Sequence, residues 1–461
     1  MVANRLGGDF TGAVLGPGDP EYDAARRVWN GTVDRRPALI ARCHRPGDVA
    51  AALRHAVAEG LPVSVRGGGH NVAGTAVADG ALLIDLAPMR GVSVDAAAGL
   101  VTAEGGCLLG DLDAATTPYG LACPAGVVSH TGLGGLALGG GYGWLARKWG
   151  LTCDHLVAAE VVLADGSVVE ATAHSHPELL WALRGGGGNF GVVTRFTLRL
   201  RPVGPVYFRR AVYPVALAAP VLAAYQDFAE VQDADLHAVG TLRRAVANDW
   251  VPAELHGRPA LHLSTAWFGD PAHGRAATEA LHGAVAPAGS AEQVLSYGAL
   301  QALGDTSEPH GHRYYTKSCY LEGIAAAADE LAAATEEIPG AQGETSVPLS
   351  TVDFEYLRGA IAADGADSAF PNRDAPYICT ASAHWTDPAG DAPHAAWSRR
   401  TIGRLAPWRH DGVYVNYQED SGNSRAMDSY GDARYRQLAE VKRKYDPHNL
   451  FRGNQNIRPS A

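Results

Sequence analysis

The chain of 461 residues lacks several features that mark common classes of protein. No apolar run reaches the length of a membrane span. Lysine and arginine total 38 against 49 acidic residues, which gives a net charge of −11, and no basic block is present. These absences argue against a membrane surface or a nucleic acid as the partner.

Cysteines and targeting signals are scarce as well. The six cysteines are scattered and form no C-x-x-C pair, and the first ten residues lack the apolar core of a signal peptide. We therefore expect reduced thiols and a cytoplasmic protein. The sequence also contains no G-x-S-x-G, P-loop or HExxH motif, so it does not indicate hydrolase, phosphate-loop or zinc-protease chemistry.

Two histidine pairs are the nearest approach to a metal site. His174 and His176 form one pair, and His310 and His312 form the other. Neither pair has a third ligand in a supporting pattern, so we expect no metal. We expect the segment around His310 to lie at the rim of a substrate cleft instead.

Glycine, by contrast, is abundant and unevenly spread. Of the 55 glycines, three clusters lie at 67–69, 132–143 and 185–191, all within the first 200 residues. Glycine-rich turns present backbone N–H groups to an anion and let it approach closely. One such cluster is explained equally well as a loop. Three together predict a cradle for one large anionic ligand, to which Arg66 adds positive charge.

The pattern of elements changes near residue 202. Before it, short apolar strands and glycine-rich turns predominate; after it, alanine-rich helices at 215–232 and 323–338 alternate with aromatic strands at 260–269 and 312–321. From about Trp408 we expect strand again and then a helix. A chain of this length exceeds one ordinary core. We predict a cofactor region at 1–202, a substrate region at 203–405 and a segment at 406–461 that returns to the first.

The stretch GLGGLA resembles a dinucleotide fingerprint, with Gly132, Gly134 and Ala137 at the required spacing. Asp154 and Glu160 stand roughly where a ribose-binding carboxylate would. The fingerprint needs a strand before it and an uninterrupted helix after it, yet three consecutive glycines follow. Each glycine costs a helix about 1 kcal/mol. We therefore reject a Rossmann unit.

Five stretches of the sequence resemble a known family. They are VRGGGHNVAG at 65–74, GVVSHTGLGGLALGGGYGWLARKWGLTCDHLVAAEVVLADG at 126–166, ELLWALRGGGGNFGVVTRF at 178–196, YVNYQED at 414–420 and KRKYDPHNLFRGNQNI at 442–457. In this order they resemble the FAD-linked oxidases of the vanillyl-alcohol oxidase superfamily, in the berberine-bridge-enzyme-like branch. The resemblance implies an α+β fold. It consists of a PCMH-type FAD-binding domain of two subdomains and a substrate domain with an antiparallel sheet flanked by helices.

The resemblance also implies the residues that hold FAD. His70, at the end of the glycine triplet, would be bonded covalently to the flavin, and the other cofactor-binding positions would be Arg66, Gly67, Gly68, Gly69, Asn71, Gly126, Val127, Thr131, Gly132, Gly134, Gly135, Gly139, Gly141, Tyr142, Gly191, Val193, Tyr414, Asn416 and Asn454. Many relatives add a bond from a cysteine whose place here falls near Val128. We therefore expect a single histidyl link, with Cys123 as a buried small hydrophobe.

Within the branch, the stretches WNGTVDRRPALIARC and GVVSHTGLGGLALGGG are most similar to the Favorskii-type flavoenzymes of enterocin biosynthesis. That similarity implies an oxygen pocket formed by His130, Thr131 and Leu136, where a flavin-N5-oxide would form. Each residue also has an ordinary interpretation, as a loop histidine, a backbone-binding threonine and a core leucine.

The catalytic residues implied by the family are Tyr417, as the base that takes a proton from the substrate, and Tyr142. An ordinary tyrosine has a pKa near 10, so an apolar site with a cation would have to lower it, and Lys317 is the candidate cation. If 414–417 is a strand, Tyr414 and Tyr417 face opposite sides. The glutamate base of the plant alkaloid enzyme has no counterpart that the sequence places.

Together these residues predict an enzyme, a covalent-FAD oxidase of a hydrophobic small molecule. The substrate would be polyketide-like or another secondary metabolite, with O2 as acceptor. One alternative is a sugar or oligosaccharide alcohol oxidase of the same branch, which a polar, aromatic-poor cleft would favour. The other is a non-catalytic flavoprotein that sequesters a drug, which tight binding without oxygen consumption would favour.

Overall fold

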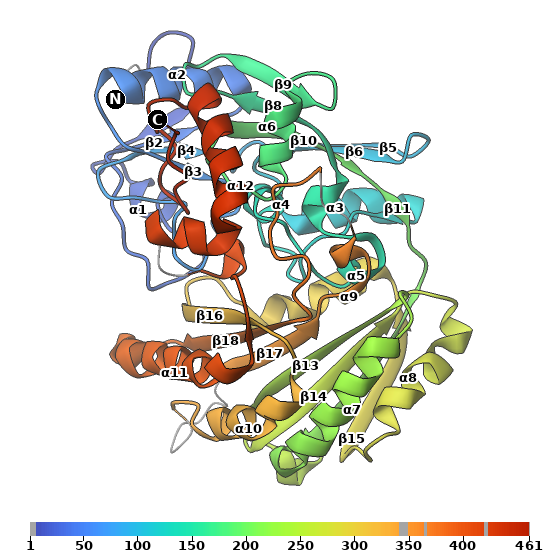
Figure 1. Ribbon diagram of the computed structural model, residues 1–461. Coiled ribbons are helices and arrows are strands. Elements are labelled where there is room, and N and C mark those ends of the chain that lie inside the picture. Colours follow the sequence, from blue (N-terminus) through green and yellow to red (C-terminus); the bar gives the residue numbers. More distant parts are fainter. Residues whose placement is uncertain (1–5, 341–348, 364–366, 419–422, 461) are drawn as a thin grey trace.

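The computed structural model describes residues 6–340, 349–363, 367–418 and 423–460 (Figure 1). Its helices and strands form an α+β fold. Two smaller sheets are formed by the first part of the chain, and one large antiparallel sheet is formed by residues 206–410. No helix in these ranges is both long enough and apolar enough to cross a bilayer. The last two residues of the YVNYQED stretch lie outside the described ranges.

The first sheet has four strands in the order β1-β2-β4-β3, and β2, β4 and β3 run parallel. The parallel strands β2, β3 and β4 are largely apolar and buried, as strands of a parallel sheet covered by helices usually are. Its elements are β1 (Ala13–Leu15), α1 (Tyr22–Ala25), β2 (Leu39–Arg42), α2 (Pro46–Ala58), β3 (Val63–Arg66) and β4 (Leu82–Asp85). The chain leaves β3 directly into the glycine triplet at 67–69.

The second sheet has five antiparallel strands in the order β5-β6-β10-β8-β9. Asp165 and Gly166 lie in the turn of an antiparallel hairpin that β8 and β9 form. Its elements are β5 (Val92–Asp95), β6 (Leu100–Glu104), α3 (Leu109–Thr116), α4 (Leu133–Leu138), α5 (Ala146–Trp149), β8 (Leu156–Val162), β9 (Val168–Thr172), α6 (Pro177–Leu183) and β10 (Val192–Arg199), and two-residue strands β7 (Leu121–Ala122) and β11 (Arg201–Pro202) pair beside it. The GLGGLA stretch lies in and before α4, which has only six residues, so it does not start a long Rossmann-type helix.

The large sheet has eight antiparallel strands in the order β15-β12-β14-β13-β17-β18-β16-β19. Its elements are β12 (Val206–Pro214), α7 (Ala218–Val231), β13 (Leu236–Arg244), β14 (Pro259–Trp267), α8 (Gly274–His282), β15 (Gly289–Leu295), α9 (Tyr297–Gln301), β16 (Arg313–Leu321), α10 (Ala328–Glu336), β17 (Thr351–Tyr356), β18 (Tyr377–Trp385), α11 (Asp391–Arg404) and β19 (Arg409–His410). Helices α7, α8, α10 and α11 cover its outer face (Figure 1). The inner face is left to the first part of the chain.

The C-terminal segment begins in the large sheet and ends in the first part. Strand β19 pairs with β16, after which α12 (Asn423–Tyr445, kinked at Gly431) packs into the core of the five-stranded sheet. Buried Lys442 donates hydrogen bonds to the carbonyl oxygens of Asn189 and Phe451 and pairs with Asp446. The division of the chain into regions that end at 202 and 405 stays a prediction. Strand β19 follows residue 405 but belongs to the large sheet, because its backbone pairs with β16 at the edge of that sheet.

Candidate functional site

One cavity of about 620 Å³ lies between the two parts of the molecule. Its volume is within the range of ordinary small-molecule and cofactor sites. One wall is built from the glycine-rich loops of the first part, and the opposite wall is the inner face of the eight-stranded sheet. We call these the cofactor wall and the sheet wall.

The glycines of the cofactor wall allow loops to touch one another. A Cβ at Gly68 would lie 2.5 Å from the backbone of Gly132, and one at Gly132 would lie 2.3 Å from the amide nitrogen of Gly68. A Cβ at Gly139 would lie 2.0 Å from the side chain of Asn416. Real Cβ atoms do not approach so closely. These glycines therefore let the loops of the cofactor wall pack directly against one another and against Asn416.

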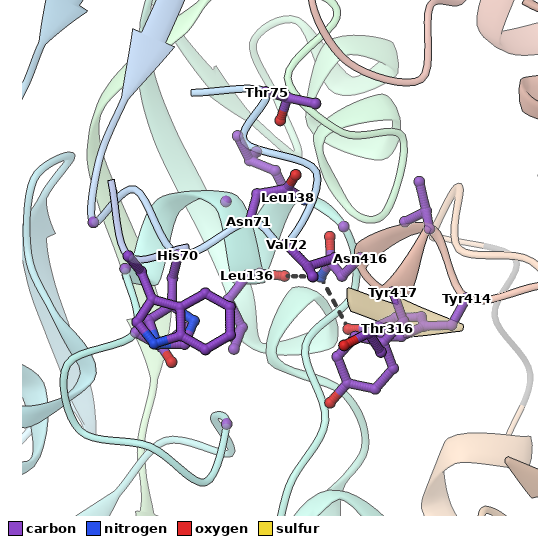
Figure 2. Close-up of a pocket in the computed structure, with 18 of the residues that line it drawn as sticks. His70, Asn71, Val72, Thr75, Leu136, Leu138, Thr316, Tyr414, Asn416 and Tyr417 are labelled. Carbon is purple, nitrogen blue, oxygen red and sulfur yellow. Dashed lines mark hydrogen bonds between the residues drawn. The ribbon is translucent and has the colours of Figure 1, made fainter. Parts of the chain in front are cut away.

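Most of the predicted cofactor positions line this cavity: Gly67, Gly68, Gly69, His70, Asn71, Gly126, Val127, Thr131, Gly132, Gly134, Gly135, Gly139, Tyr142, Gly191, Val193, Tyr414, Asn416 and Asn454. They come from loops after β3, around α4 and before β10, and from the C-terminal segment. Figure 2 shows His70 on one side and the tyrosines on the other, with Asn416 between them. The Asn416 amide donates to the carbonyl oxygen of Leu136 at 3.2 Å and to the Tyr414 hydroxyl at 3.0 Å.

Two predicted cofactor positions do not line the cavity. The Arg66 guanidinium pairs with Asp85 at 2.7 Å and donates to the carbonyl oxygen of Arg27, so its charge is already neutralised within the protein. The Gly141 amide donates to the Tyr414 hydroxyl at 3.0 Å, and its Cβ position is filled by Thr152 and Leu136. Both residues support the wall from behind.

His70 lies in a stack of rings. The Trp29 indole is stacked on the His70 imidazole at 4.2 Å and on the Tyr314 ring at 3.7 Å. Nε2 of His70 lies 3.1 Å from Nδ1 of His130, and the His310 ring packs on that of His130. Burial, followed by the neighbouring histidines, lowers the pKa of His70 to about 3. The imidazole is therefore neutral at physiological pH, which is the nucleophilic form.

The three tyrosines gather at one point, and the prediction that Tyr414 and Tyr417 face opposite sides is wrong. Residues Val415–Tyr417 form a turn of 3₁₀ helix rather than a strand, so the side chains do not alternate. The ring of Tyr417 lies 5.0 Å from that of Tyr414 and 5.9 Å from that of Tyr142. Burial raises the pKa of Tyr417, and the charge of Glu355 raises it further, while a hydrogen bond from Tyr142 acts in the opposite direction.

Lys317 is not placed to lower the pKa of Tyr417. Strand β16 alternates, so Tyr314 and Thr316 face the cavity while Lys317 faces the other side of the sheet. There the Lys317 ammonium lies over the ring of Tyr315, 5.9 Å from its centroid. The prediction that Lys317 lowers the pKa of Tyr417 is therefore wrong. Because burial raises the pKa of both Tyr142 and Tyr417, both are protonated phenols at neutral pH.

The polar residues of the sheet wall were missed in the sequence. They are Thr241 and Arg243 on β13, Thr351, Asp353 and Glu355 on β17, Thr380, Ser382 and His384 on β18, Thr316 on β16 and Glu308 in the preceding loop. Strands β17 and β18 alternate polar and apolar residues, which is visible in the sequence. The same alternation is typical of a strand that faces solvent, so the sequence alone does not indicate a site.

The remaining predicted positions are also placed. Thr131 and Leu136 line the cavity, whereas His130 reaches it through its contact with His70. Cys123 is fully buried in the core beside the five-stranded sheet, as predicted. Among the described residues no three His, Cys, Asp or Glu side chains gather as metal ligands would, and His176 instead contacts the Tyr445 hydroxyl at 2.9 Å.

Comparisons with known proteins support the cofactor. A family model described as an FAD binding domain matches residues 37–172, and one described as berberine and berberine-like matches 413–458. The chain is 31% identical to an FAD-linked oxidoreductase of Dictyostelium discoideum, covering all of this chain and 97% of that protein. It is 43% identical to (R)-6-hydroxynicotine oxidase of Paenarthrobacter nicotinovorans over 41% of each chain.

Solved structures show the same fold. The structure of 6-hydroxy-D-nicotine oxidase from Arthrobacter nicotinovorans superposes with a TM-score of 0.86 at 28% identity, covering 100% of both chains. BBE-like 1 from Physcomitrella patens superposes with a TM-score of 0.87 at 23% identity, covering 99% of both. The glycine cradle, in which the Cβ positions of Gly68, Gly132 and Gly139 are closed to side chains, fits a cofactor with a pyrophosphate. This chain therefore belongs to the FAD-linked oxidoreductases of the berberine-bridge-enzyme-like branch, with the PCMH-type fold of the vanillyl-alcohol oxidase superfamily.

Proposed function

We propose that this protein is an oxidase that holds FAD on the cofactor wall through a single covalent bond to His70 and passes electrons from a small molecule to O2. The observation that carries this proposal is the position of His70. Its neutral imidazole lies at the end of the glycine triplet and opens into the same cavity as Tyr142 and Tyr417. Val127 and Val128 line the cavity near the place of the second, cysteinyl link of relatives.

When bound, FAD supplies acceptance of a hydride from the substrate and reoxidation by O2. The chain itself supplies the glycine loops that bind the cofactor, the Trp29 stack that orients His70, and the phenols that contact the substrate. We propose Tyr417 as the group that accepts the substrate proton, with Tyr142 donating a hydrogen bond to its oxygen. Thr131, Leu136 and His130 are proposed as the oxygen pocket, and N5-oxide chemistry stays a prediction.

The raised pKa of Tyr417 has a consequence for pH dependence. Only the phenolate can accept a proton, and its fraction grows about tenfold for each pH unit below the pKa. We therefore expect kcat/KM to rise with pH up to at least pH 9. A plateau beginning below pH 7 would assign proton removal to another group.

The polarity of the sheet wall indicates which substrates the cavity can bind. The polyketide-like substrate expected from the sequence suits this wall where it carries oxygen substituents, because polar side chains occupy most inward positions of β13, β17 and β18. The same polar face favours a second candidate, a sugar or oligosaccharide alcohol oxidase. A purely hydrocarbon substrate would leave buried polar groups without partners, which costs about 1–3 kcal/mol for each group.

The proposal is tested by reducing the holoprotein without oxygen and then mixing it with O2. An oxidase is reoxidised within seconds and forms hydrogen peroxide, whereas flavin that stays reduced for minutes would contradict the proposal. Tyr417→Phe is the matched variant. It should leave reoxidation unchanged and slow substrate-dependent reduction by about 10²–10⁴-fold. Rapid reoxidation combined with tight ligand binding but no turnover would instead indicate a flavoprotein that sequesters its ligand.

A further inference from the structure

The sheet wall carries two adjacent rows made entirely of polar residues. Strand register places residues of β13, β17, β18 and β16 side by side on the inner face. One row reads Thr241, Asp353, Thr380 and Ser318, and the next reads Arg243, Thr351, Ser382 and Thr316. The row nearest the tyrosines is different, since it reads Val239, Glu355, Ile378 and Tyr320. Polarity therefore increases with distance from the tyrosines.

Arg243 is the most exceptional member of these rows. Its side chain lines the cavity, and its guanidinium makes no hydrogen bond or ion pair with any residue that the structure describes. Its Nε is completely buried without a partner. Asp353 and Glu308, which also line the cavity, are close enough for their charges to act on Arg243, and burial lowers its pKa. A buried donor without a partner is costly, and the rest of the half-buried guanidinium lines the cavity, so the group is positioned for something that enters it.

The two carboxyl groups near Arg243 are available as well. Each oxygen of Asp353 accepts one hydrogen bond, from Thr241 at 2.7 Å and from Thr351 at 2.5 Å, which leaves lone pairs for a ligand. Burial raises the pKa of Glu308 to about 8, so this carboxyl is mostly protonated at neutral pH. Arg243 thus faces one further carboxyl group, Asp353, whose pKa burial raises while the threonine hydrogen bonds and the charge of Arg243 act in the opposite direction. A cationic ligand would be repelled by Arg243 and an anionic ligand by Asp353, whereas a neutral oxygen group can use all three.

The spacing of the rows gives a length. Val239, which pairs with Glu355 beside the tyrosines, and Arg243 are four residues apart on β13. A strand rises about 3.3 Å per residue, so the row of Val239 and the row of Arg243 are about 13 Å apart. A molecule that reacts near Tyr417 and reaches Arg243 is about two six-membered rings long.

We propose that Arg243, Asp353 and Glu308 bind the far end of an elongated, neutral, oxygen-rich substrate. Arg243 donates to a hydroxyl or carbonyl oxygen, and the two carboxyl groups exchange hydrogen bonds with hydroxyls. This inference rests on the proposed function, because the reacting end is placed by Tyr417. The substrate class is therefore uncharged molecules with several oxygen substituents, which include disaccharides and aromatic polyketides.

The test is calorimetric titration of the FAD-loaded protein with four probes of similar length. Cellobiose and naringenin are the neutral probes, the first a disaccharide and the second an aromatic polyketide; 4-phenylpiperidine is the cation and biphenyl-4-carboxylate the anion. We expect one neutral probe to bind more tightly than either charged probe. Arg243→Met should weaken that binding at least about tenfold, since hydrogen bonds from charged groups are the strong ones. Arg243→Lys should restore part of it.

Arg244→Met is the control, because it removes a neighbouring guanidinium from the opposite sheet face. Arg244 donates to the carbonyl oxygens of Gly257 and Glu336, away from the cavity. Unchanged neutral-probe binding in Arg243→Met, tighter binding of a charged probe, or no binding of either neutral probe would overturn the inference. The flavin content of each sample separates this failure from that of the proposed function. Protein without FAD would contradict the function, whereas FAD-loaded protein that prefers a charged probe contradicts only the substrate class.

Discussion

The cofactor wall is built mainly from backbone, whereas the sheet wall is built from side chains. The cofactor wall consists of backbone loops that approach each other closely where glycines remove the side chains, as at Gly68 and Gly132. The sheet wall consists of side chains that project from four strands, such as Arg243 on β13 and Asp353 on β17. Where its loops touch, a wall made of backbone tolerates almost no added atom, whereas a wall made of side chains can change one residue at a time. The difference indicates that cofactor binding is constrained by the fold and that substrate choice is adjustable on the same fold.

Gly132→Ala should have the largest effect and sharpens this comparison. The new methyl carbon would lie 2.3 Å from the Gly68 amide nitrogen, and neither backbone can move without separating two loops. We expect loss of FAD binding and a free energy of unfolding lower by about 3 kcal/mol or more. Fluorescence of bound flavin and thermal unfolding measure both quantities.

Gly135→Ala is the matched control for that change. Gly135 also lines the cavity, but nothing lies within 4 Å of its Cβ position. The variant should fold normally, since alanine favours the helix, and should load less FAD because the methyl group enters the cavity. Equal effects of the two alanines on unfolding would break the comparison.

Glu308→Gln tests the sheet wall through pH. The pKa of Glu308 is about 8 in the folded chain against an ordinary 4.5. The folded state therefore binds the proton more tightly, and this contribution is fully present below pH 4.5 and is lost as pH rises to 8. We expect the wild type to lose thermal stability relative to Glu308→Gln across that interval. Parallel stability curves for the two proteins would show that Glu308 is not held protonated.

Thr241→Val should have the smallest effect. It removes one of the two threonine hydrogen bonds to Asp353 and leaves the other. We expect a loss of about 1–2 kcal/mol in unfolding free energy with normal FAD content. Thr241→Ser, which keeps the hydroxyl, should behave like the wild type in the same denaturation curves. A drop in FAD content in Thr241→Val would show that the sheet wall also determines cofactor binding.

The same difference explains what the sequence could predict. The glycine triplet and His70 are neighbours in the chain, so the cofactor wall was visible as a short motif and its glycines were predicted. The sheet wall joins Arg243, Glu308 and Asp353, which the fold brings together from separate loops and strands. No local pattern marks such a cluster. The predictions that Lys317 lies near Tyr417 and that Tyr414 and Tyr417 face opposite sides were wrong for a related reason. Strand register and a 3₁₀ turn decide which way a side chain faces.

The most direct test of the account is the intact mass of the protein after denaturation, measured for the wild type and for His70→Ala. The account predicts that the unfolded wild type carries the added mass of one FAD and that His70→Ala carries none. A wild type without the added mass, or a His70→Ala variant that keeps it, would contradict the assignment of His70 as the covalent anchor.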